Sequence, residues 1–296
     1  MKKIAWVSSL AVLLIVGIFL FSPSKTHKVH KKRAPEQTYD CFLFFNELKL
    51  LEMRLNELND SVDKFVIVEA METFTGKPKP LNFLQHRHLF KQFEEKIIYI
   101  PVERFKAVSA WDRETFQRNQ IARGLINCKK QDIIILSDLD EIIRSNKIPL
   151  MKEYLSSHPD SFISYELSMY RCFVNRTVPD LPYWVGPVAA TYKQFKKLNA
   201  QKMRDQRLDS PMIVKKGGWH FSSMGGHKMW CEKVEGFSHT EVDTPENKDP
   251  VKLFAAIKDL PLVPIDESYP IFIQKNQTEL KRLGFISSVE DEAYPP

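Results

Sequence analysis

The alternation of short apolar runs with amphipathic segments between residues 40 and 137 limits the possible fold more than any other feature of this sequence. Four short apolar runs have the length of buried strands: residues 40–45, 65–69, 97–101 and 132–137. Two further segments, 47–58 and 112–127, show the spacing of apolar residues that is typical of helices. Strands that alternate with helices are expected to form parallel βαβ units with right-handed crossovers. We therefore predict an α/β fold.

The predicted strands are apolar throughout, which favours a mostly parallel central sheet with both faces covered. In the first helix four leucines fall on one stripe, and the charged residues are expected to lie away from it: Glu47, Glu52, Arg54 and Glu57. After about residue 145 the pattern weakens, because short runs, prolines and aromatic residues dominate. We expect this second half to be irregular, with ligands bound beyond the carboxyl ends of the strands.

Residues 4–22 contain no charged side chain and are predicted to form a single transmembrane signal anchor. A helix of this length spans about 28 Å, close to the hydrocarbon thickness of a membrane. The alternative is a cleaved signal peptide, but its apolar run is usually shorter and ends in small residues. The anchor is expected between a short tail (1–3) and a basic flexible stem (23–38), followed by one folded domain (39–296).

The formal net charge of +6 comes from the N-terminus. Residues 1–33 contain seven basic and no acidic side chains, which leaves 36 basic and 37 acidic groups in the rest of the chain. The domain therefore lacks the basic excess that nucleic-acid binding requires, and we expect no nucleic-acid partner. More basic residues follow the apolar segment than precede it, and the positive-inside rule would then place the domain in the cytoplasm.

The segment Ser137-Asp138-Leu139-Asp140-Glu141 follows the most apolar predicted strand. Asp138 and Asp140 are two residues apart, so in an extended chain their carboxylates project to the same side. Such a pair suits a divalent ion, Mn²⁺ or Mg²⁺, that can bridge a diphosphate and neutralise charge on a leaving group. An acidic surface loop is the plain alternative. A phosphatase site is another, but it normally follows the first strand and has Thr or Val where Glu141 stands.

Residues 217–226 contain four of the ten glycines, in two pairs that flank an aromatic residue and a histidine. Glycine permits positive φ and close approach of the backbone to a ligand. Trp219 could then stack on a sugar face, and His220 could ligate a metal or bind a phosphate. The alternative is a tight turn with a packed tryptophan. His239, in the segment 237–241, is a lone histidine that by itself is more often structural.

The helix that leads into the fourth predicted strand carries polar side chains at helical spacing. Arg113, Gln117 and Gln120 could share one face of this helix. Arginine suits bidentate recognition of phosphate, whereas a solvated charged helix is the alternative. A further aromatic segment begins at Trp184 and could line a groove for a second substrate.

Six segments of the chain resemble glycosyltransferase family 17: FFNELKLLEMRLNEL (44–58), VEAMETFTGKPKPLNF (68–83), DRETFQRNQIARGL (112–125), IILSDLDEI (134–142), GGWHFSSMGG (217–226) and FSHTE (237–241). The resemblance implies a GT-A-like nucleotide-diphospho-sugar transferase fold, whose irregular half binds the acceptor. It also implies inverting transfer of N-acetylglucosamine from UDP-GlcNAc to a mannose-containing glycan in β-1,4 linkage, as in N-glycan processing. The partners would be this donor, the glycan acceptor and a membrane.

The resemblance also implies roles for individual residues. Asp138 and Asp140 match the family's metal-binding DxD motif, and His239 matches a C-terminal histidine that completes the metal shell. Donor-binding residues are expected within the matching segments: Asn46, Glu69, Arg113, Arg118, Asn119, Asp138 and Trp219. No pattern identifies the base that deprotonates the acceptor. The candidate catalytic residues are Glu141, His220 and Asp209, with Asp205 as a further carboxylate.

Eukaryotic relatives are type II Golgi proteins with a lumenal catalytic domain, whereas the charges around the predicted anchor favour the reverse orientation. We expect a single-pass membrane protein, in the Golgi if the source is eukaryotic and in the inner membrane if it is bacterial. Two other classes remain open at this point. One is a catalytically silent sugar-binding protein on the same fold, and the other is a hydrolase of phosphate esters.

Overall fold

The computed structural model describes residues 36–105, 108–289 and 291 of the chain, and Glu36–Pro296 cluster as one compact unit. The predicted tail and anchor, and nearly all of the predicted stem, lie outside the described residues. None of the helices in the described part has both the length and the apolar character that are needed to cross a membrane.

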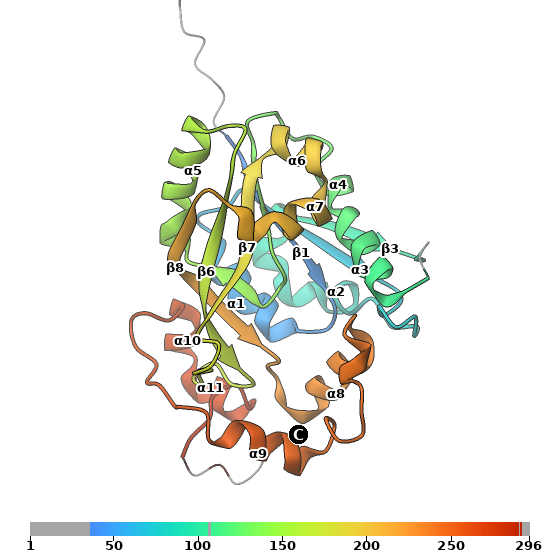
Figure 1. Cartoon of the computed structure of the whole chain (residues 1–296), viewed down its shortest axis with the longest axis vertical. Helices are drawn as coiled ribbons and strands as arrows, with labels where there is room; N and C mark the ends of the chain where they lie inside the picture. The colour runs from blue at the N-terminus through green and yellow to red at the C-terminus, as the bar shows by residue number, and fades with distance from the viewer. Residues whose placement is uncertain (1–35, 106–107, 290, 292–296) are drawn as a thin grey trace, which may run out of the picture. The chain divides into compact units, whose positions relative to one another are not determined.

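A single sheet of eight strands forms the centre of the part that the structure describes, in the order β3-β2-β1-β4-β7-β6-β8-β5 (Figure 1). The strands are β1 (Thr38–Phe44), β2 (Lys64–Ala70), β3 (Ile97–Val102), β4 (Ile133–Leu136), β5 (Glu141–Ile143), β6 (Phe162–Arg171), β7 (Tyr183–Thr191) and β8 (Ile213–Ser222). The four strands expected from apolar runs are β1 to β4. The α/β class is therefore confirmed.

The sheet is mixed: six of its eight strands run in one direction, in line with the expected mostly parallel sheet, whereas β5 and β7 run in the other. β3, β2, β1 and β4 are parallel neighbours, as are β6 and β8, whereas β7 runs antiparallel to β4 and to β6, and β5 runs antiparallel to β8. The second half is also regular, because β6, β7 and β8 extend the sheet. Local composition hides these strands. Gly186 and Pro187 lie where the β6–β7 register shifts, and Lys216 has a positive φ where the β6–β8 register shifts.

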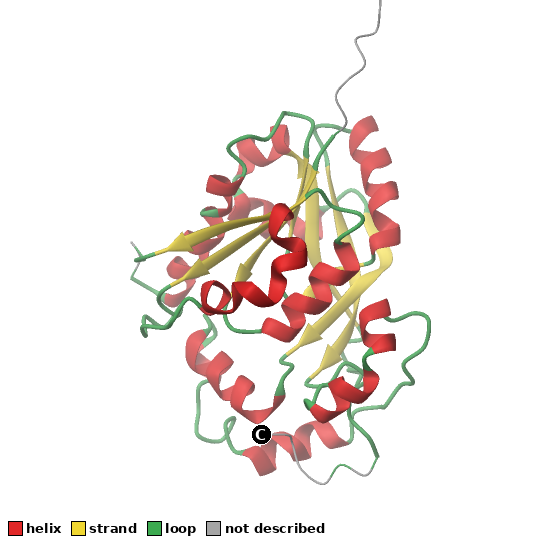
Figure 2. Cartoon of the chain, turned by 180° about the vertical axis from the view of Figure 1, so that it is seen from behind, coloured by secondary structure: helices red, strands yellow, loops and turns green. Residues whose placement is uncertain are grey.

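Helices cover both faces of the sheet (Figures 1 and 2). They are α1 (Leu48–Leu58), α2 (Asn82–His86), α3 (Ala110–Asn119), α4 (Ile121–Gly124), α5 (Ile148–Ser157), α6 (Tyr192–Leu198), α7 (Ala200–Asp205), α8 (Gly226–Gly236), α9 (Pro250–Lys258), α10 (Ile271–Lys275) and α11 (Gln277–Arg282). One buried cluster joins the sheet to α1, α2 and α5, and a second joins the opposite face to α4, α6 and α7. The alternation of side chains along β1 separates the clusters, with Phe42 and Phe44 in the first and Tyr39 and Cys41 in the second.

Helix α1 confirms the first predicted helix, but one of its charged residues is placed differently from the prediction. Arg54 is fully buried, although the sequence pattern assigns it to the polar side. Its guanidinium group binds the carboxylate of Asp40 on β1, with both residues excluded from solvent. A buried ion pair of this kind explains how a charged side chain can lie within the apolar core.

The directions of the strands bring many chain segments to one edge of the sheet. The carboxyl ends of β1, β2, β4, β6 and β8 meet there, together with the amino ends of β5 and β7, which run the other way. The strand order reverses between β1 and β4, because β2 and β3 lie on the far side of β1. In open α/β sheets this switch point is where ligands bind.

Candidate active site

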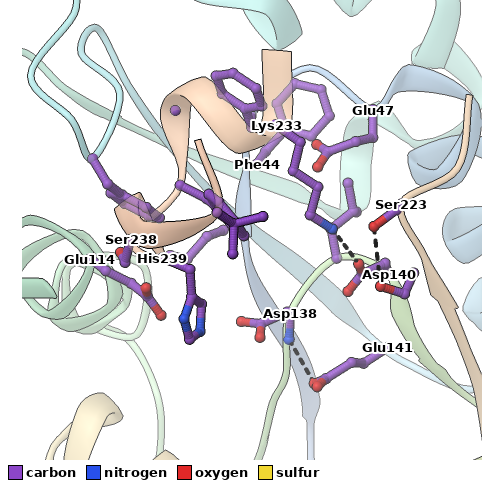
Figure 3. A pocket seen from close by; sticks show the side chains of 18 of the residues that line it. Phe44, Glu47, Glu114, Asp138, Asp140, Glu141, Ser223, Lys233, Ser238 and His239 are labelled. Atoms are coloured by element: carbon purple, nitrogen blue, oxygen red, sulfur yellow. Dashed lines mark hydrogen bonds and ion pairs between the residues drawn. The ribbon is translucent and has the colours of Figure 1, made fainter. Parts of the chain in front are cut away.

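A cavity of about 540 Å³ lies at this edge of the sheet. Its walls come from the segments after β1 and β2, helix α3, the acidic turn 138–141, the ends of β6 and β8, the start of β7, and helix α8 with the residues that follow it. Figure 3 shows Asp138 and Asp140 on the acidic turn and His239 on a different wall of this space. The acidic segment predicted from the sequence is therefore part of a cavity.

The buried guanidinium group of Arg54 holds the acidic turn from below. It donates to Ser137 Oγ at 2.6 Å and to the carbonyl oxygens of Asp138 at 2.8 Å, Leu139 at 3.2 Å and Glu141 at 3.1 Å. Because the carbonyl oxygens of the turn point to Arg54, the side chains of Asp138 and Asp140 remain available on the cavity side.

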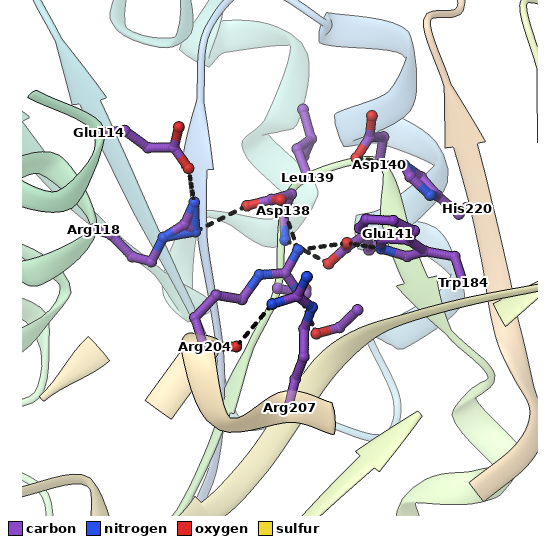
Figure 4. A network of polar contacts seen from close by, with 12 residues as sticks. Glu114, Arg118, Asp138, Leu139, Asp140, Glu141, Trp184, Arg204, Arg207 and His220 are labelled. Atoms are coloured by element: carbon purple, nitrogen blue, oxygen red, sulfur yellow. Dashed lines mark hydrogen bonds and ion pairs between the residues drawn. The ribbon is translucent and has the colours of Figure 1, made fainter. Parts of the chain in front are cut away.

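Asp138 extends into the cavity with 41% of its side chain exposed. Its carboxylate oxygens accept hydrogen bonds from Arg118 on α3 at 3.1 Å and from Arg204 on α7 at 2.8 Å (Figure 4). Desolvation by the cavity walls alone would raise the pKa of Asp138, but the two guanidinium groups outweigh this effect and lower the pKa. Asp138 is therefore a stable anion at neutral pH.

Asp140 is less accessible, with 13% of its side chain exposed. Lys233 on α8 lies 3.2 Å from one carboxylate oxygen, and His220 on β8 lies 3.5 Å from the other. Burial alone would raise the pKa of Asp140, but Lys233 and His220 hold it well below its usual range. Burial alone would lower the pKa of Lys233, but Asp140 and Glu47 outweigh it and raise the pKa. Both partners therefore stay charged.

Glu141 is only 1% exposed, and its carboxylate is engaged by the protein itself. Oε1 accepts from the indole N–H of Trp184 at 2.6 Å and from Arg204 at 2.6 Å, while Oε2 accepts from the backbone N–H of Asp138 at 3.0 Å (Figure 4). This geometry contradicts the predicted role of Glu141 as a catalytic base. Glu141 instead positions Asp138, Trp184 and Arg204.

Two of the predicted donor-binding residues are buried away from the cavity, so these predictions are wrong. Trp219 is 2% exposed and packs beneath the guanidinium group of Arg144, which lies 4.1 Å from the ring. Alternate residues of a strand face opposite sides, so Trp219 points to the core while His220 points to the cavity. Glu69 is fully buried and accepts from Lys79 at 3.1 Å and from the backbone N–H of Phe83.

Among the other predicted donor-binding residues, Arg118 and Asp138 line the cavity. The remaining three do not line it and bond to neighbouring segments: Asn46 to Glu232, Arg113 to the carbonyl of Phe74, and Asn119 to the backbone N–H of Gln201. Their contacts position the walls of the site, because each joins two segments that are far apart in the sequence.

Of the predicted catalytic residues, His220 lines the cavity and Asp209 does not. Asp209 lies exposed at the end of the 3₁₀ turn Gln206–Asp209, and Asp205 is exposed at the end of α7, so neither fits a base within the site. His239 lines the cavity with 53% of its side chain exposed, and its Nδ1 lies 2.7 Å from Glu241.

The carboxylates of Asp138 and Asp140 are the oxygen donors that Mn²⁺ or Mg²⁺ prefers. Within residues 36–105, 108–289 and 291, no three His, Cys, Asp or Glu side chains gather into a set that could hold a metal. His239 lines the same cavity as the two aspartates, but it does not form such a set with them, and its place in a metal shell stays a prediction. If such an ion bound here, Asp138 and Asp140 are the residues that would hold it.

The two glycine pairs serve different structural purposes. The first pair, at 217–218, lies in β8 rather than in a turn. A Cβ atom on Gly218 would lie 2.1 Å from the carbonyl oxygen of Ile142, so this glycine permits β8 and β5 to approach each other. Gly225 and Gly226 have φ values of +97° and +85° where α8 begins. The close approach predicted at the first pair is made to a strand of the same protein and not to a ligand.

Sequence reasoning missed three cations of the site. Lys233 and Arg204 lie in segments without a recognisable pattern, and only the fold brings them to the acidic turn. Arg54 left a faint signal, because it lies three residues after Leu51 and four before Leu58 and so borders the apolar stripe of α1.

Residues 21–257 match the sequence model of glycosyltransferase family 17. The chain belongs to this family. The resemblance predicted from six short segments is thereby confirmed.

Curated relatives of this family 17 chain include the human and rat β-1,4-mannosyl-glycoprotein 4-β-N-acetylglucosaminyltransferases. Each is 27% identical over 235 residues, a region that covers 72% of this chain and 44% of the relative. The chain thus matches less than half the length of these relatives. Among solved structures, 4-diphosphocytidyl-2C-methyl-D-erythritol synthase is similar with a TM-score of 0.41 and 11% identity, covering 61% of this chain and 90% of the synthase.

Proposed function

We propose that this protein transfers N-acetylglucosamine from UDP-GlcNAc to a mannose-containing glycan in β-1,4 linkage, with inversion, on a GT-A-like fold. The observation that carries the proposal is the acidic turn with Asp138 and Asp140, which borders a cavity at the switch point of a family 17 sheet. The names of the relatives support the choice of sugar and linkage.

A divalent ion, Mn²⁺ or Mg²⁺, is part of this proposal, and the charges of the cavity support it. Six acidic side chains line the cavity, against four basic ones. They are Glu47, Glu72, Glu114, Asp138, Asp140 and Glu141, against Lys79, Arg118, Arg171 and Lys233. Arg204 does not line the cavity, but it pairs with Asp138 and Glu141 and offsets part of this excess. A diphosphate would bring further negative charge to the remaining carboxylates, which a bound cation would compensate. When bound by Asp138 and Asp140, the ion would neutralise charge on the leaving diphosphate.

The proposed reaction is a single displacement at the anomeric carbon of the donor. The acceptor hydroxyl oxygen forms a bond to the anomeric carbon while the bond between that carbon and the diphosphate oxygen breaks. The hydroxyl proton passes to a base. Lys233 and Arg118 lie on either side of the acidic turn and can stabilise negative charge on the diphosphate. We retain His220 as the proposed catalytic side chain, because it lines the cavity beside Asp140.

We also propose that residues 4–22 anchor the protein in a membrane by a single pass, in the Golgi of a eukaryote or the inner membrane of a bacterium. The support is the uncharged segment itself. Protease treatment of sealed vesicles tests both points. Protection of the catalytic domain would place it in the lumen, whereas recovery of the full chain in the soluble fraction would refute the anchor.

The transferase proposal is tested by incubating the full chain with a panel of UDP-sugars and mannose-containing acceptors. We expect UDP release with UDP-GlcNAc, a β-1,4-linked product by NMR, loss of turnover in EDTA, and recovery with Mn²⁺. Asp138→Asn should lower kcat by about 10²–10³-fold, the usual effect of removing one group that stabilises a transition state. The matched control is Asp160→Asn, an exposed aspartate bonded to Lys193 and Lys197, which should keep full activity.

Two results would contradict the proposal. Undiminished turnover in EDTA, or by Asp138→Asn, would remove the metal and the role of the acidic turn. Failure of every UDP-sugar to react, when the sugar acceptor still binds, would favour a catalytically silent sugar-binding protein.

A further inference from the structure

Trp111 is a large aromatic residue that the fold leaves half exposed inside the cavity. It lies in the first turn of α3, 50% of it is exposed, and it lines the cavity wall. A tryptophan at such a position leaves apolar surface in contact with water, which burial against a ligand would remove.

The ring of Trp111 contacts His239, and the helix turn that carries Trp111 is fixed by hydrogen bonds. His239 contacts the indole edge to face, with ring centroids 4.7 Å apart and an interplanar angle of 83°. The start of α3 is fixed by a capping box between Ser109 and Asp112, and Ser238 Oγ donates to the carbonyl of Ala110 at 3.3 Å. The backbone that carries the indole is therefore ordered before any ligand binds, which limits the entropy that binding would cost.

Helix α3 links this ring to the acidic turn. Arg118 lies seven residues after Trp111, about 10 Å along the helix axis, and binds Asp138. Glu114 and Gln117, between them, also line the cavity. The same helix thus presents an aromatic surface at one end and, beside the acidic turn, an arginine at the other, a span comparable to that between the base and the phosphates of a nucleotide.

The cavity wall that contains Trp111 and the opposite wall are built from different parts of the sheet. Helix α3, which carries Trp111, contacts β1 and β2 in the parallel half of the sheet, beside the switch point between β1 and β4, where ligands bind in open α/β folds. The other wall is built by the ends of β6 and β8 and the start of β7, with Arg171, Trp184 and His220. That wall remains for the acceptor.

We infer that Trp111 is the stacking platform for the nucleobase of the sugar donor. This inference rests on the proposed function and adds a residue that determines nucleotide affinity. Stacking on an aromatic side chain tolerates any base, because every base has a π face, and its removal typically weakens binding by about 5- to 150-fold.

The test measures binding of UDP, uridine and ribose 5-phosphate to the full chain by calorimetry, with Mn²⁺ present. Trp111→Ala is expected to weaken UDP and uridine by the same factor, within about 5- to 150-fold, and to leave ribose 5-phosphate unchanged. Trp111→Phe keeps a stacking face and should recover most of the affinity. The control is Tyr183→Ala, which truncates an aromatic residue that is 51% exposed and lies outside the cavity lining.

The outcomes separate this inference from the proposed function. If wild type binds UDP and Trp111→Ala binds it equally well, the inference is overturned and the transferase proposal stands. A raised KM for the glycan acceptor with unchanged UDP affinity would also overturn it, because Trp111 would then contact the acceptor. If wild type prefers another nucleoside diphosphate and Trp111→Ala weakens that one, the proposed donor fails and the stacking role stands. If wild type binds no nucleoside diphosphate, both fail.

Discussion

Replacement of Arg54 by methionine is expected to destabilise the protein more than most single substitutions. In the native structure this side chain is fully buried and makes a two-pronged ion pair with Asp40, at 2.8 Å from Nε and 2.6 Å from Nη2. It also binds Ser137 Oγ and three carbonyl oxygens of the acidic turn. Methionine is similar in length and apolar, so the change removes the charge and the donors while it preserves much of the packing.

The magnitude follows from what the substitution leaves behind. Asp40 becomes a buried carboxylate without a counter-charge, and removal of one partner from a buried ion pair costs about 3–5 kcal/mol. The turn that carries Asp138 also loses its hydrogen-bond donors. Most domains are stable by about 5–15 kcal/mol, so we expect a folded but weakened protein. With an m-value near 3 kcal/mol/M, the urea midpoint should fall by about 1–1.7 M.

The assay is urea denaturation followed by tryptophan fluorescence, applied to Arg54→Met, Asp40→Leu and the double variant. Because the double variant leaves no unpaired charge, it should lose less stability than the sum of the two single variants, and the difference measures the coupling of the pair. Arg54→Lys retains the charge but not the planar fork, and should recover only part of the loss. A single-variant loss below about 1 kcal/mol, or strict additivity in the double variant, would refute the reasoning.

Three further predictions concern the same edge of the sheet. Burial raises the pKa of Glu47 despite Lys233, so the folded state disfavours the ionised form of this side chain. The Glu47→Gln variant should match the stability of wild type at pH 4 and become relatively more stable as the pH rises through the unfolded and then the folded pKa of Glu47. Urea titrations of both proteins at pH 4 and pH 7.5 would show this difference. Gly218→Ala should lower Tm, because the new Cβ atom meets a backbone oxygen. Overpacking costs roughly 1–3 kcal/mol, and each kcal/mol lowers Tm by about 2–4 °C. An unchanged Tm by calorimetry would contradict this prediction. Arg204→Met removes one of the two cations beside Asp138 and should raise the pKa of that carboxyl, as measured by NMR titration, with an unchanged pKa counting against the proposed network.

Local patterns were sufficient for the first half of the sheet and for the acidic turn. β1 to β4 could be located because a strand buried on both faces must be apolar along its whole length, which is visible in one window of sequence. The same patterns failed for β7 and β8. Gly186, Pro187 and the glycine pair at 217–218 suggest turns, but they are accommodated by register shifts and by close strand pairing, which depend on partners far away in the chain.

The sequence by itself determined that the chain alternates strands with helices, that Asp138 and Asp140 follow a buried strand, and that its motifs resemble family 17. Only the tertiary structure decided that Arg54 is buried, that Trp219 faces the core while His220 faces the cavity, and that Lys233 and Arg204 neutralise the acidic turn. The physical reason is the range of the interactions. The burial of a strand is written into its own residues, whereas the partner of a charge depends on segments that only the folded chain brings together.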